Sequence, residues 1–247
     1  AVTIPEGVLC IGGSNKQVAK AEVWLLRRNG DVVETESWPA LPAPLLFASG
    51  VLVGRTVYIA GGVHDAEEAP LRQMLALDLD APAATRAWRE IEPWPGDARM
   101  LPTTGSLGGS FYLFSGHNLV RGEDGELHRD YLSDCWQYTP GKGWAQLADI
   151  PVALQATPSP APTLGSSHLF VLGGDDGKYL EQTIELRERH PGFPPAVYGF
   201  TTTSNTWAEM DQLPRDLGPD PEGNPNAGIW PPIVAPVVAW HGGWAIV

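Results

Sequence analysis

The sequence is poor in cysteine and in basic side chains. Its two cysteines, Cys10 and Cys135, fall in runs that we predict to be strands, so we expect two buried thiols rather than a disulfide. No cysteine and histidine cluster has the spacing of a zinc site. Sixteen Lys and Arg stand against 29 Asp and Glu, for a net charge of −13. A chain this acidic, with no lysine-rich run, is a poor partner for nucleic acid or an anionic membrane surface.

Long hydrophobic runs are also absent. No apolar stretch approaches the length of a membrane-spanning helix, so no membrane association is expected. The order of the residues shows no nucleophile elbow, phosphate-binding loop or complete Ser-His-Asp series. Glycine and proline are abundant, with 28 and 24 residues. This composition is typical of a protein rich in turns.

A repeat of about 50 residues runs through the chain. In each copy a short apolar run meets a small-residue turn, and a tryptophan follows tens of residues later. The turns are Gly12-Gly13, Gly61-Gly62, Ser115-Gly116 and Gly173-Gly174, and the tryptophans are Trp38, Trp88, Trp144 and Trp207. This layout is typical of kelch repeats, each of which forms one four-stranded antiparallel blade of a β-propeller.

The repeat predicts where the strands of each blade lie. The second strands, near the central channel, are expected at Val8–Ile11, Thr56–Ala60, Ser110–Phe114 and His168–Leu172. The third strands are expected at Glu22–Arg27, Gln73–Leu79, Ser133–Tyr138 and Ala196–Thr201, and the fourth strands carry the tryptophans. The first strands are expected at Leu46–Val53, Met100–Leu107 and Thr157–Leu164, and a fifth set at Ile233–Trp240 and Trp244–Val247.

No linker interrupts the repeat, so residues 1–247 are predicted to form a single all-β domain of the kelch-propeller class. The first blade is expected to be partial, because the sequence starts in the turn before Val8. About four to five blades are expected in all. Such an open array leaves apolar blade faces uncovered. We therefore expect the chain to be part of a longer protein, rather than a closed ring of four or five blades.

Function in a propeller resides in the loops at one end of the channel. Long loops are expected at 63–72, 117–132 and 175–195, with a short helix over 179–189 and a proline-rich connection at 214–232. We predict substrate-binding roles for five residues at this end of the blades, and we assign neither catalytic residues nor a metal site. The five are Asn15, Arg99, His117, Asp176 and His190.

Each of these residues has a plain structural alternative. Asp176, beside Asp175, could orient a sugar hydroxyl or bind a metal, or it could close an Asx turn. The guanidinium of Arg99 could bind a ligand carboxylate or form a salt bridge with a neighbouring blade. His190 could contact a sugar oxygen or pack in its turn. Asn15 and His117 could be ordinary loop residues.

Five runs carry a resemblance to a known family: residues 8–14, 38–42, 93–96, 171–177 and 190–193. They resemble the cyclically permuted mutarotase branch of the kelch proteins, which includes the bacterial N-acetylneuraminate epimerases. The resemblance implies a six-bladed propeller that interconverts the anomers of N-acetylneuraminate or a related acidic monosaccharide. It implies no metal or organic cofactor, and it favours the bacterial periplasm over the cytoplasm.

The family's catalytic run, Gly-Glu-x-x-Pro-Gly-x-Arg, is expected to follow the strand that ends at Val247, so the chain does not contain it. A non-catalytic kelch propeller that binds a glycan or a protein at its loop face is therefore the alternative function. A copper enzyme of the galactose-oxidase type is disfavoured, because it needs a Tyr/His/Cys constellation and both cysteines fall in predicted strands.

Overall fold

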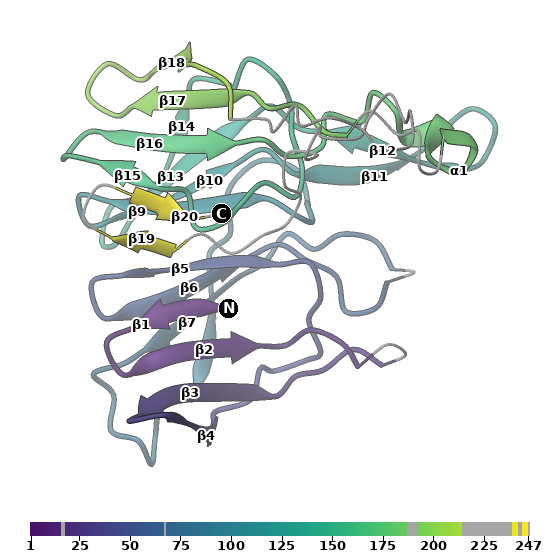
Figure 1. The fold of residues 1–247 in the computed structure, drawn as a ribbon. Helices are drawn as coiled ribbons and strands as arrows, with labels where there is room; N and C mark the ends of the chain where they lie inside the picture. Colours follow the sequence, from purple (N-terminus) through teal and green to yellow (C-terminus); the bar gives the residue numbers. More distant parts are fainter. Residues whose placement is uncertain (16–17, 67, 187–191, 214–238, 242–243, 247) are drawn as a thin grey trace, which may run out of the picture.

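The computed structural model describes residues 1–15, 18–66, 68–186, 192–213, 239–241 and 244–246. Within them the fold is almost entirely β, with four four-stranded antiparallel sheets in chain order. We call these sheets blades 1 to 4 (Figure 1). The predicted all-β class is confirmed, and the architecture is consistent with a kelch-type propeller.

Each blade takes its strands in sequence order from a short stretch of chain. Blade 1 contains β1 (Val2–Ile4), β2 (Gly7–Ile11), β3 (Val23–Asn29) and β4 (Val32–Trp38). Blade 2 contains β5 (Ser49–Val53), β6 (Thr56–Ala60), β7 (Met74–Asp78) and β8 (Trp88–Ile91). Blade 3 contains β9 (Thr103–Leu107), β10 (Ser110–Phe114), β13 (Cys135–Thr139) and β14 (Gly143–Leu147). Blade 4 contains β15 (Thr163–Leu164), β16 (His168–Leu172), β17 (Val197–Thr201) and β18 (Thr206–Glu209).

Two smaller sheets and one short helical segment complete the described structure. The hairpin of β11 (His117–Arg121) and β12 (Leu127–Tyr131) interrupts blade 3, and β19 (Ala239–His241) pairs with β20 (Trp244–Ile246). The helical segment is η1 (Leu180–Gln182) followed by α1 (Thr183–Leu186). It lies within the helix that the sequence predicted over 179–189.

The second strands are the part of the fold that the sequence predicted most closely. β6, β10 and β16 have the predicted bounds, and β2 starts one residue earlier. All five residues of β10 are buried. A strand covered on both faces by neighbouring sheets reads as an unbroken apolar run, and this run is what made these strands recognisable.

The first strands β5 and β9 each start three residues later than predicted, at Ser49 and Thr103. Three further differences are larger. Blade 1 is complete rather than partial, because Val2–Ile4 forms its first strand. The first strand of blade 4 is only Thr163–Leu164 instead of Thr157–Leu164, since prolines 158, 160 and 162 have no N–H to give to a ladder. Residues 117–132 are not a long loop, because 117–121 pair with 127–131 in the β11–β12 hairpin.

The small-residue turns after the second strands need a left-handed backbone. Gly61 has φ +70°, and a Cβ there would lie 2.3 Å from the carbonyl oxygen of Arg99. Blade 3 has Ser115 in the equivalent place, with φ +55°. The buried Ser115 hydroxyl donates to the Leu132 carbonyl at 2.7 Å and accepts from the Leu154 N–H at 2.6 Å. These hydrogen bonds offset the backbone strain that a non-glycine residue has there.

Apolar clusters fill the interfaces between successive blades. The first joins blades 1 and 2, the second blades 2 and 3, and the third blades 3 and 4. Three repeat tryptophans also donate a hydrogen bond across such an interface, to a carbonyl that follows the preceding blade's last strand. Trp88 Nε1 reaches the Pro39 oxygen at 2.9 Å, Trp144 the Glu92 oxygen at 2.8 Å and Trp207 the Ala148 oxygen at 2.8 Å.

The first strands of blades 1 to 3 contact one another, β1 to β5 and β5 to β9, and β9 in turn contacts β16, the second strand of blade 4. Just before the first strands of blades 2 to 4, Phe47, Leu101 and Ala156 share a left-handed backbone with φ of 55°, 53° and 52°. The Leu101 N–H donates to the Phe47 carbonyl at 2.8 Å, and the Ala156 N–H donates to the Leu101 carbonyl at 3.0 Å. We call these three residues the inner ring.

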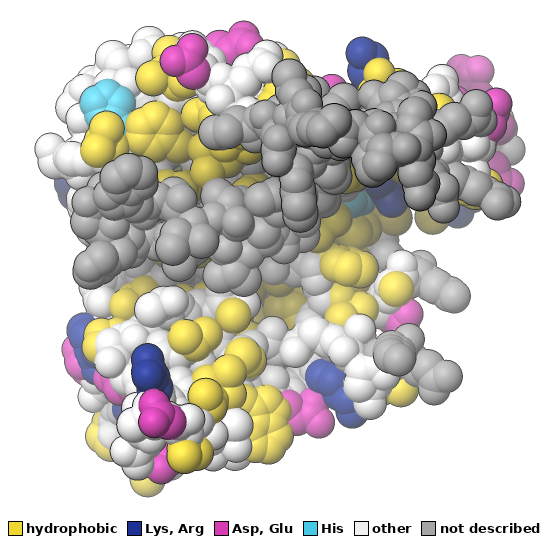
Figure 2. Space-filling model, viewed as in Figure 1, with side chains coloured by type: hydrophobic (Ala, Val, Ile, Leu, Met, Phe, Trp, Pro, Cys, Tyr) yellow, Lys and Arg dark blue, Asp and Glu magenta, His cyan; other side chains and the backbone are white. Residues whose placement is uncertain are grey.

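Neither cysteine is in a disulfide, as predicted. Cys135 is fully buried, and burial raises the pKa of its thiol, whereas Cys10 is only half-buried. None of the helical residues that the structure describes forms a helix able to cross a membrane. In the view of Figure 2, charged side chains of both signs are scattered over the described surface instead of gathering in one basic patch.

Candidate ligand-binding site

Three long connections lie at one end of the blades. They follow β6, β10 and β16, and in Figure 1 they extend together to the right of the sheets, with the β11–β12 hairpin and α1 projecting furthest. The sequence predicted that these connections gather at one end. Among the described residues, the polar groups at this end cluster where the hairpin of blade 3 meets the chain that follows β16.

Three polar side chains form the centre of this cluster. Tyr131, the last residue of β12, donates from its hydroxyl to Asp175 Oδ2 at 3.1 Å. Gln155 Nε2 donates to the Tyr131 hydroxyl at 2.9 Å and to Asp175 Oδ2 at 2.6 Å. The backbones of Gln155 and Asp175 also bond to each other in both directions, at 2.9 Å. The three side chains come from the hairpin, the link between blades 3 and 4, and the turn that follows β16.

The turn that follows β16 fits closely against the hairpin. Asp175 Oδ1 accepts from the Gly177 N–H at 2.8 Å, and Asp176 Oδ1 accepts from the Lys178 N–H at 3.1 Å. Gly177 has φ +77°, and a Cβ there would lie 2.7 Å from the ring of Tyr131. The absence of a side chain at Gly177 therefore lets the two connections pack together.

His117, the first residue of β11, lies beside this group. Its ring centroid is 6.0 Å from that of Tyr131, to which it is paired across the hairpin. The His117 residue is only 2% exposed. Burial, followed by the charge of Arg129, lowers the pKa of His117 to about 4, so the imidazole is neutral at physiological pH.

Burial and the Asp175 carboxylate raise the pKa of Tyr131 to about 12. The phenol is therefore protonated near neutral pH, which fits its role as donor to Asp175. The hydroxyl also accepts from Gln155 and so has both of its functions in use. The cluster of Tyr131, Gln155 and Asp175 is therefore a hydrogen-bonded polar wall rather than a proton-transfer group.

An open pocket of about 350 Å³ adjoins this wall. Its lining is mixed in charge and includes Arg129, Tyr131, Asp176, Lys178 and Glu181. In the described part of the chain, neither Arg129 nor Lys178 has a carboxylate in salt-bridge contact. The pocket can therefore offer two cationic groups, Arg129 and Lys178, and two carboxylates, Asp176 and Glu181, to a polar ligand.

The predicted site residues are only partly brought together. Asp176 lines the pocket, and His117 lies behind it. Asn15 is exposed in the turn of blade 1, where its N–H bonds to the Val18 carbonyl at 3.3 Å. His190 lies outside the described residues. The Asx turn that was an alternative for Asp176 is present, and it coexists with the place of Asp176 in the pocket.

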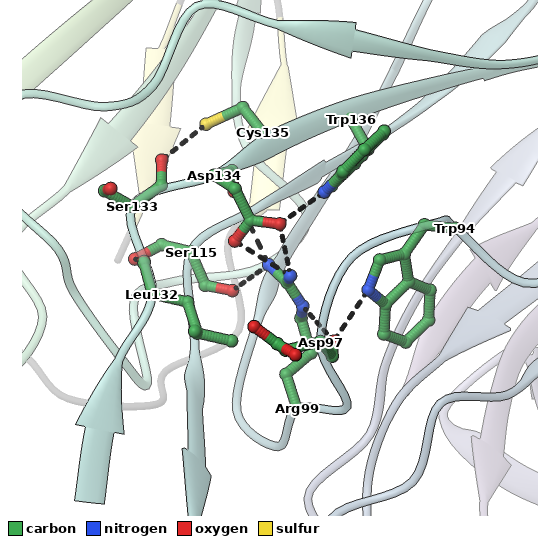
Figure 3. Close-up of polar contacts among 9 residues, drawn as sticks. All are labelled: Trp94, Asp97, Arg99, Ser115, Leu132, Ser133, Asp134, Cys135 and Trp136. Carbon is green, nitrogen blue, oxygen red and sulfur yellow. Dashed lines mark hydrogen bonds and ion pairs between the residues drawn. The ribbon is translucent and has the colours of Figure 1, made fainter.

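Arg99 has the salt bridge that was one of its two predicted roles (Figure 3). Its side chain is fully buried, and Nη2 donates to both carboxylate oxygens of Asp134, at 2.8 and 2.6 Å. Nη1 donates to the Ser115 carbonyl at 2.9 Å, and the guanidinium lies 5.3 Å from the ring centroid of Trp94. A ligand carboxylate could reach Arg99 only by displacing Asp134.

Comparisons with known proteins support the resemblance. No family model matches the chain. It is 30% identical over 207 residues to the N-acetylneuraminate epimerase of Haemophilus influenzae (strain PittEE), covering 72% of this chain and 50% of that protein. The resemblance to N-acetylneuraminate epimerases is confirmed. The enzyme of that name from Pasteurella multocida (strain Pm70) is 22% identical over 200 residues. The chain spans about half the length of these curated relatives.

A solved structure also matches the fold of this epimerase-like chain. The structure of YjhT aligns with a TM-score of 0.54 at 18% identity, covering 72% of this chain and 54% of that one. At this identity the match supports the shared fold alone.

Sequence reasoning missed Tyr131, Gln155 and Arg129. Tyr131 and Arg129 lie on β12, in a stretch that was expected to be a loop, so nothing fixed their direction. Gln155 could have been found by aligning the blades, because Leu46 and Met100 occupy the equivalent place before the inner ring. A polar side chain at a place where two other blades have apolar ones is a signal of local function. Among the described residues, no cluster of three or more potential metal ligands is found.

Proposed function

We propose that this chain forms part of the sugar-binding face of a mutarotase-like isomerase that interconverts the anomers of N-acetylneuraminate or a related acidic sugar. The observation that carries this proposal is the 30% identity to an N-acetylneuraminate epimerase over 207 residues. The polar wall and the adjoining pocket support it, since they lie at the end of the blades where the long connections gather.

The pocket suits a charged, hydroxyl-rich ligand. Arg129 and Lys178 offer positive charge to a sugar carboxylate, and Arg129 can do so with a two-pronged guanidinium. Asp176 Oδ1 holds a backbone N–H, and its other oxygen can accept from a sugar hydroxyl. Binding roles for Asn15, Arg99 and His190 stay predictions.

Anomer exchange needs two proton transfers. The anomeric hydroxyl loses a proton as the bond from the anomeric carbon to the ring oxygen breaks, and the ring oxygen gains a proton; closure on the other face reverses both steps. Asp175 is held by three hydrogen bonds, and Tyr131 has a pKa of about 12, so neither suits these transfers near neutral pH. The glutamate and arginine that the family resemblance implies as the catalytic pair stay a prediction.

The test is exchange between the anomers of N-acetylneuraminate, followed by NMR with the full-length protein. We expect exchange to be faster than in matched buffer and to depend on protein concentration. A full-length protein that binds the sugar without accelerating exchange would contradict the isomerase and favour a non-catalytic glycan-binding propeller. A protein that neither binds the sugar nor accelerates its exchange would exclude N-acetylneuraminate as its ligand.

A further inference from the structure

Two buried polar atoms at the polar wall have no hydrogen-bond partner. They are Nδ1 of His117 and Oε1 of Gln155. Both residues are almost wholly buried, with exposed fractions of 2% and 3%. A buried donor or acceptor without a partner costs folding free energy, and such atoms are rare in native proteins. Two of them in adjoining residues therefore need an explanation.

The two residues are neighbours in space. The residues that precede them are joined, because the Gly116 N–H donates to the Leu154 carbonyl at 2.8 Å. Both side chains also adjoin Tyr131, His117 through its ring and Gln155 through its hydrogen bond to the hydroxyl. Tyr131 in turn lines the open pocket, so it adjoins both the pocket and the two residues that carry these atoms.

The fold itself does not require polar residues here. In blade 4, Gln155, which precedes the first strand, pairs through its backbone with Asp175, which follows the second strand. The equivalent pairs are Leu46 with Val63 in blade 2 and Met100 with His117 in blade 3. Leu46, Val63 and Met100 form a small apolar cluster of their own. A valine or methionine is therefore compatible with this backbone, so the backbone does not require the two unpaired atoms, His117 Nδ1 and Gln155 Oε1.

We propose that His117 Nδ1 and Gln155 Oε1 together bind one hydroxyl group of a saccharide. Gln155 Oε1 can only accept, so the ligand group must donate to it. A hydroxyl can do so and at the same time accept from the Nδ1–H of a neutral imidazole, whereas a carboxylate cannot donate at all. The hydroxyl reaches the two atoms when the Tyr131 side chain shifts. This inference rests on the proposed function only for the class of ligand.

The experiment compares His117→Val and His117→Phe with wild type in the full-length protein. Valine is the residue at the matching place in blade 2, and phenylalanine keeps a ring beside Tyr131. The control is His168→Val. His168 is the first residue of β16, at the opposite end of that strand from Asp175 and the pocket. Binding of N-acetylneuraminate, N-acetylmannosamine and glucose is measured by calorimetry, Tm by thermal unfolding, and anomer exchange by NMR.

We expect both His117 variants to bind the preferred sugar at least tenfold more weakly, with a Tm equal to or above that of wild type. The control should bind like wild type. Unchanged affinity, or a Tm lowered by several degrees in both variants, would show that His117 is merely structural and overturn the inference. So would a wild-type protein that binds none of the three sugars.

The outcomes separate this inference from the proposed function. If wild type and His117→Val accelerate exchange equally, the proposed isomerase activity is supported and the proposed hydroxyl site is excluded. Binding that depends on His117 without any acceleration of exchange would keep the hydroxyl site and remove the isomerase.

Discussion

Arg99 is the most tightly held charged residue in the described structure. It lies in the link between blades 2 and 3, and Asp134, its partner, directly precedes β13. The Trp136 indole also donates to Asp134, so the carboxylate is fixed from both sides. Gly96 completes the contact, since a Cβ there would lie 2.5 Å from Asp134 Oδ2. The charge pair therefore joins two blades rather than facing the pocket.

Replacing Asp134 with alanine should lower the free energy of unfolding by about 3 to 5 kcal/mol, because it leaves a buried guanidinium without its counter-charge. Urea unfolding monitored by tryptophan fluorescence measures this change. The control is Glu36→Ala, which breaks the exposed pair of Glu36 with Arg27 at 2.8 Å and should cost less than about 1 kcal/mol. Equal effects of the two variants would refute the structural role of the Arg99 pair.

His117 and His128 lie on paired strands of one hairpin, and their pKa values are shifted in opposite directions. Burial and the nearby charge of Arg129 hold the pKa of His117 at about 4, with Asp175 opposing them. A hydrogen bond to Asp124 raises the pKa of His128. NMR titration of the imidazole resonances should show His128 gaining its proton first as the pH falls. The reverse order would contradict the burial of His117.

The same pKa gives a sign to the pH dependence of stability. Folded His117 binds protons less readily than unfolded histidine, whose pKa is 6.5. The free energy of unfolding should therefore carry a contribution that is full above pH 6.5 and is lost as the pH falls from 6.5 to 4. Comparing the stability of wild type and His117→Val across this window isolates the contribution, and a difference that does not vary with pH would contradict it.

At the scale of elements, the β11–β12 hairpin is the structure that organises the site. It supplies His117, Arg129 and Tyr131, and it packs on the turn at Gly177 that follows β16. Its contact with that turn therefore sets the geometry of both the pocket and the polar wall.

Gly177→Ala should separate the hairpin from blade 4. The new Cβ would meet the Tyr131 ring at 2.7 Å, and sugar binding should weaken with it. Gly125→Ala is the matched control: Gly125 also has positive φ, +83°, but a Cβ there meets nothing within 4 Å. We expect Gly177→Ala to be less stable than the control by about 1 to 3 kcal/mol in urea unfolding. Similar losses in the two variants would show that the contact with Tyr131 has no importance.

The sequence could predict the strands that recur in every blade. Apolar runs that end at left-handed turns identify the second strands, because burial on both faces and a sharp turn each restrict the residue type. The hairpin is particular to blade 3, and the exposure of most of its side chains removes the apolar alternation that signals a strand. The polar wall was missed for the same reason, since it depends on where that hairpin places Tyr131.

At the scale of the whole molecule, each pair of successive blades is joined by its own apolar cluster and by a tryptophan hydrogen bond. Contacts of this kind link nearest neighbours, so stability is expected to be a sum over blades and interfaces. The repeat pattern was sufficient to predict this arrangement. The pairing of Arg99 was not, because the sequence left its two roles open.

The inner ring bears on how such a molecule can acquire new specificities. Phe47, Leu101 and Ala156 are tied to one another by main-chain atoms alone, and a phenylalanine, a leucine and an alanine serve equally well. The residues just before them, Leu46, Met100 and Gln155, differ in polarity although these main-chain hydrogen bonds are the same. Substitutions at these three places can keep the main-chain hydrogen bonds of the inner ring, which makes them positions to diversify in a search for altered ligand binding.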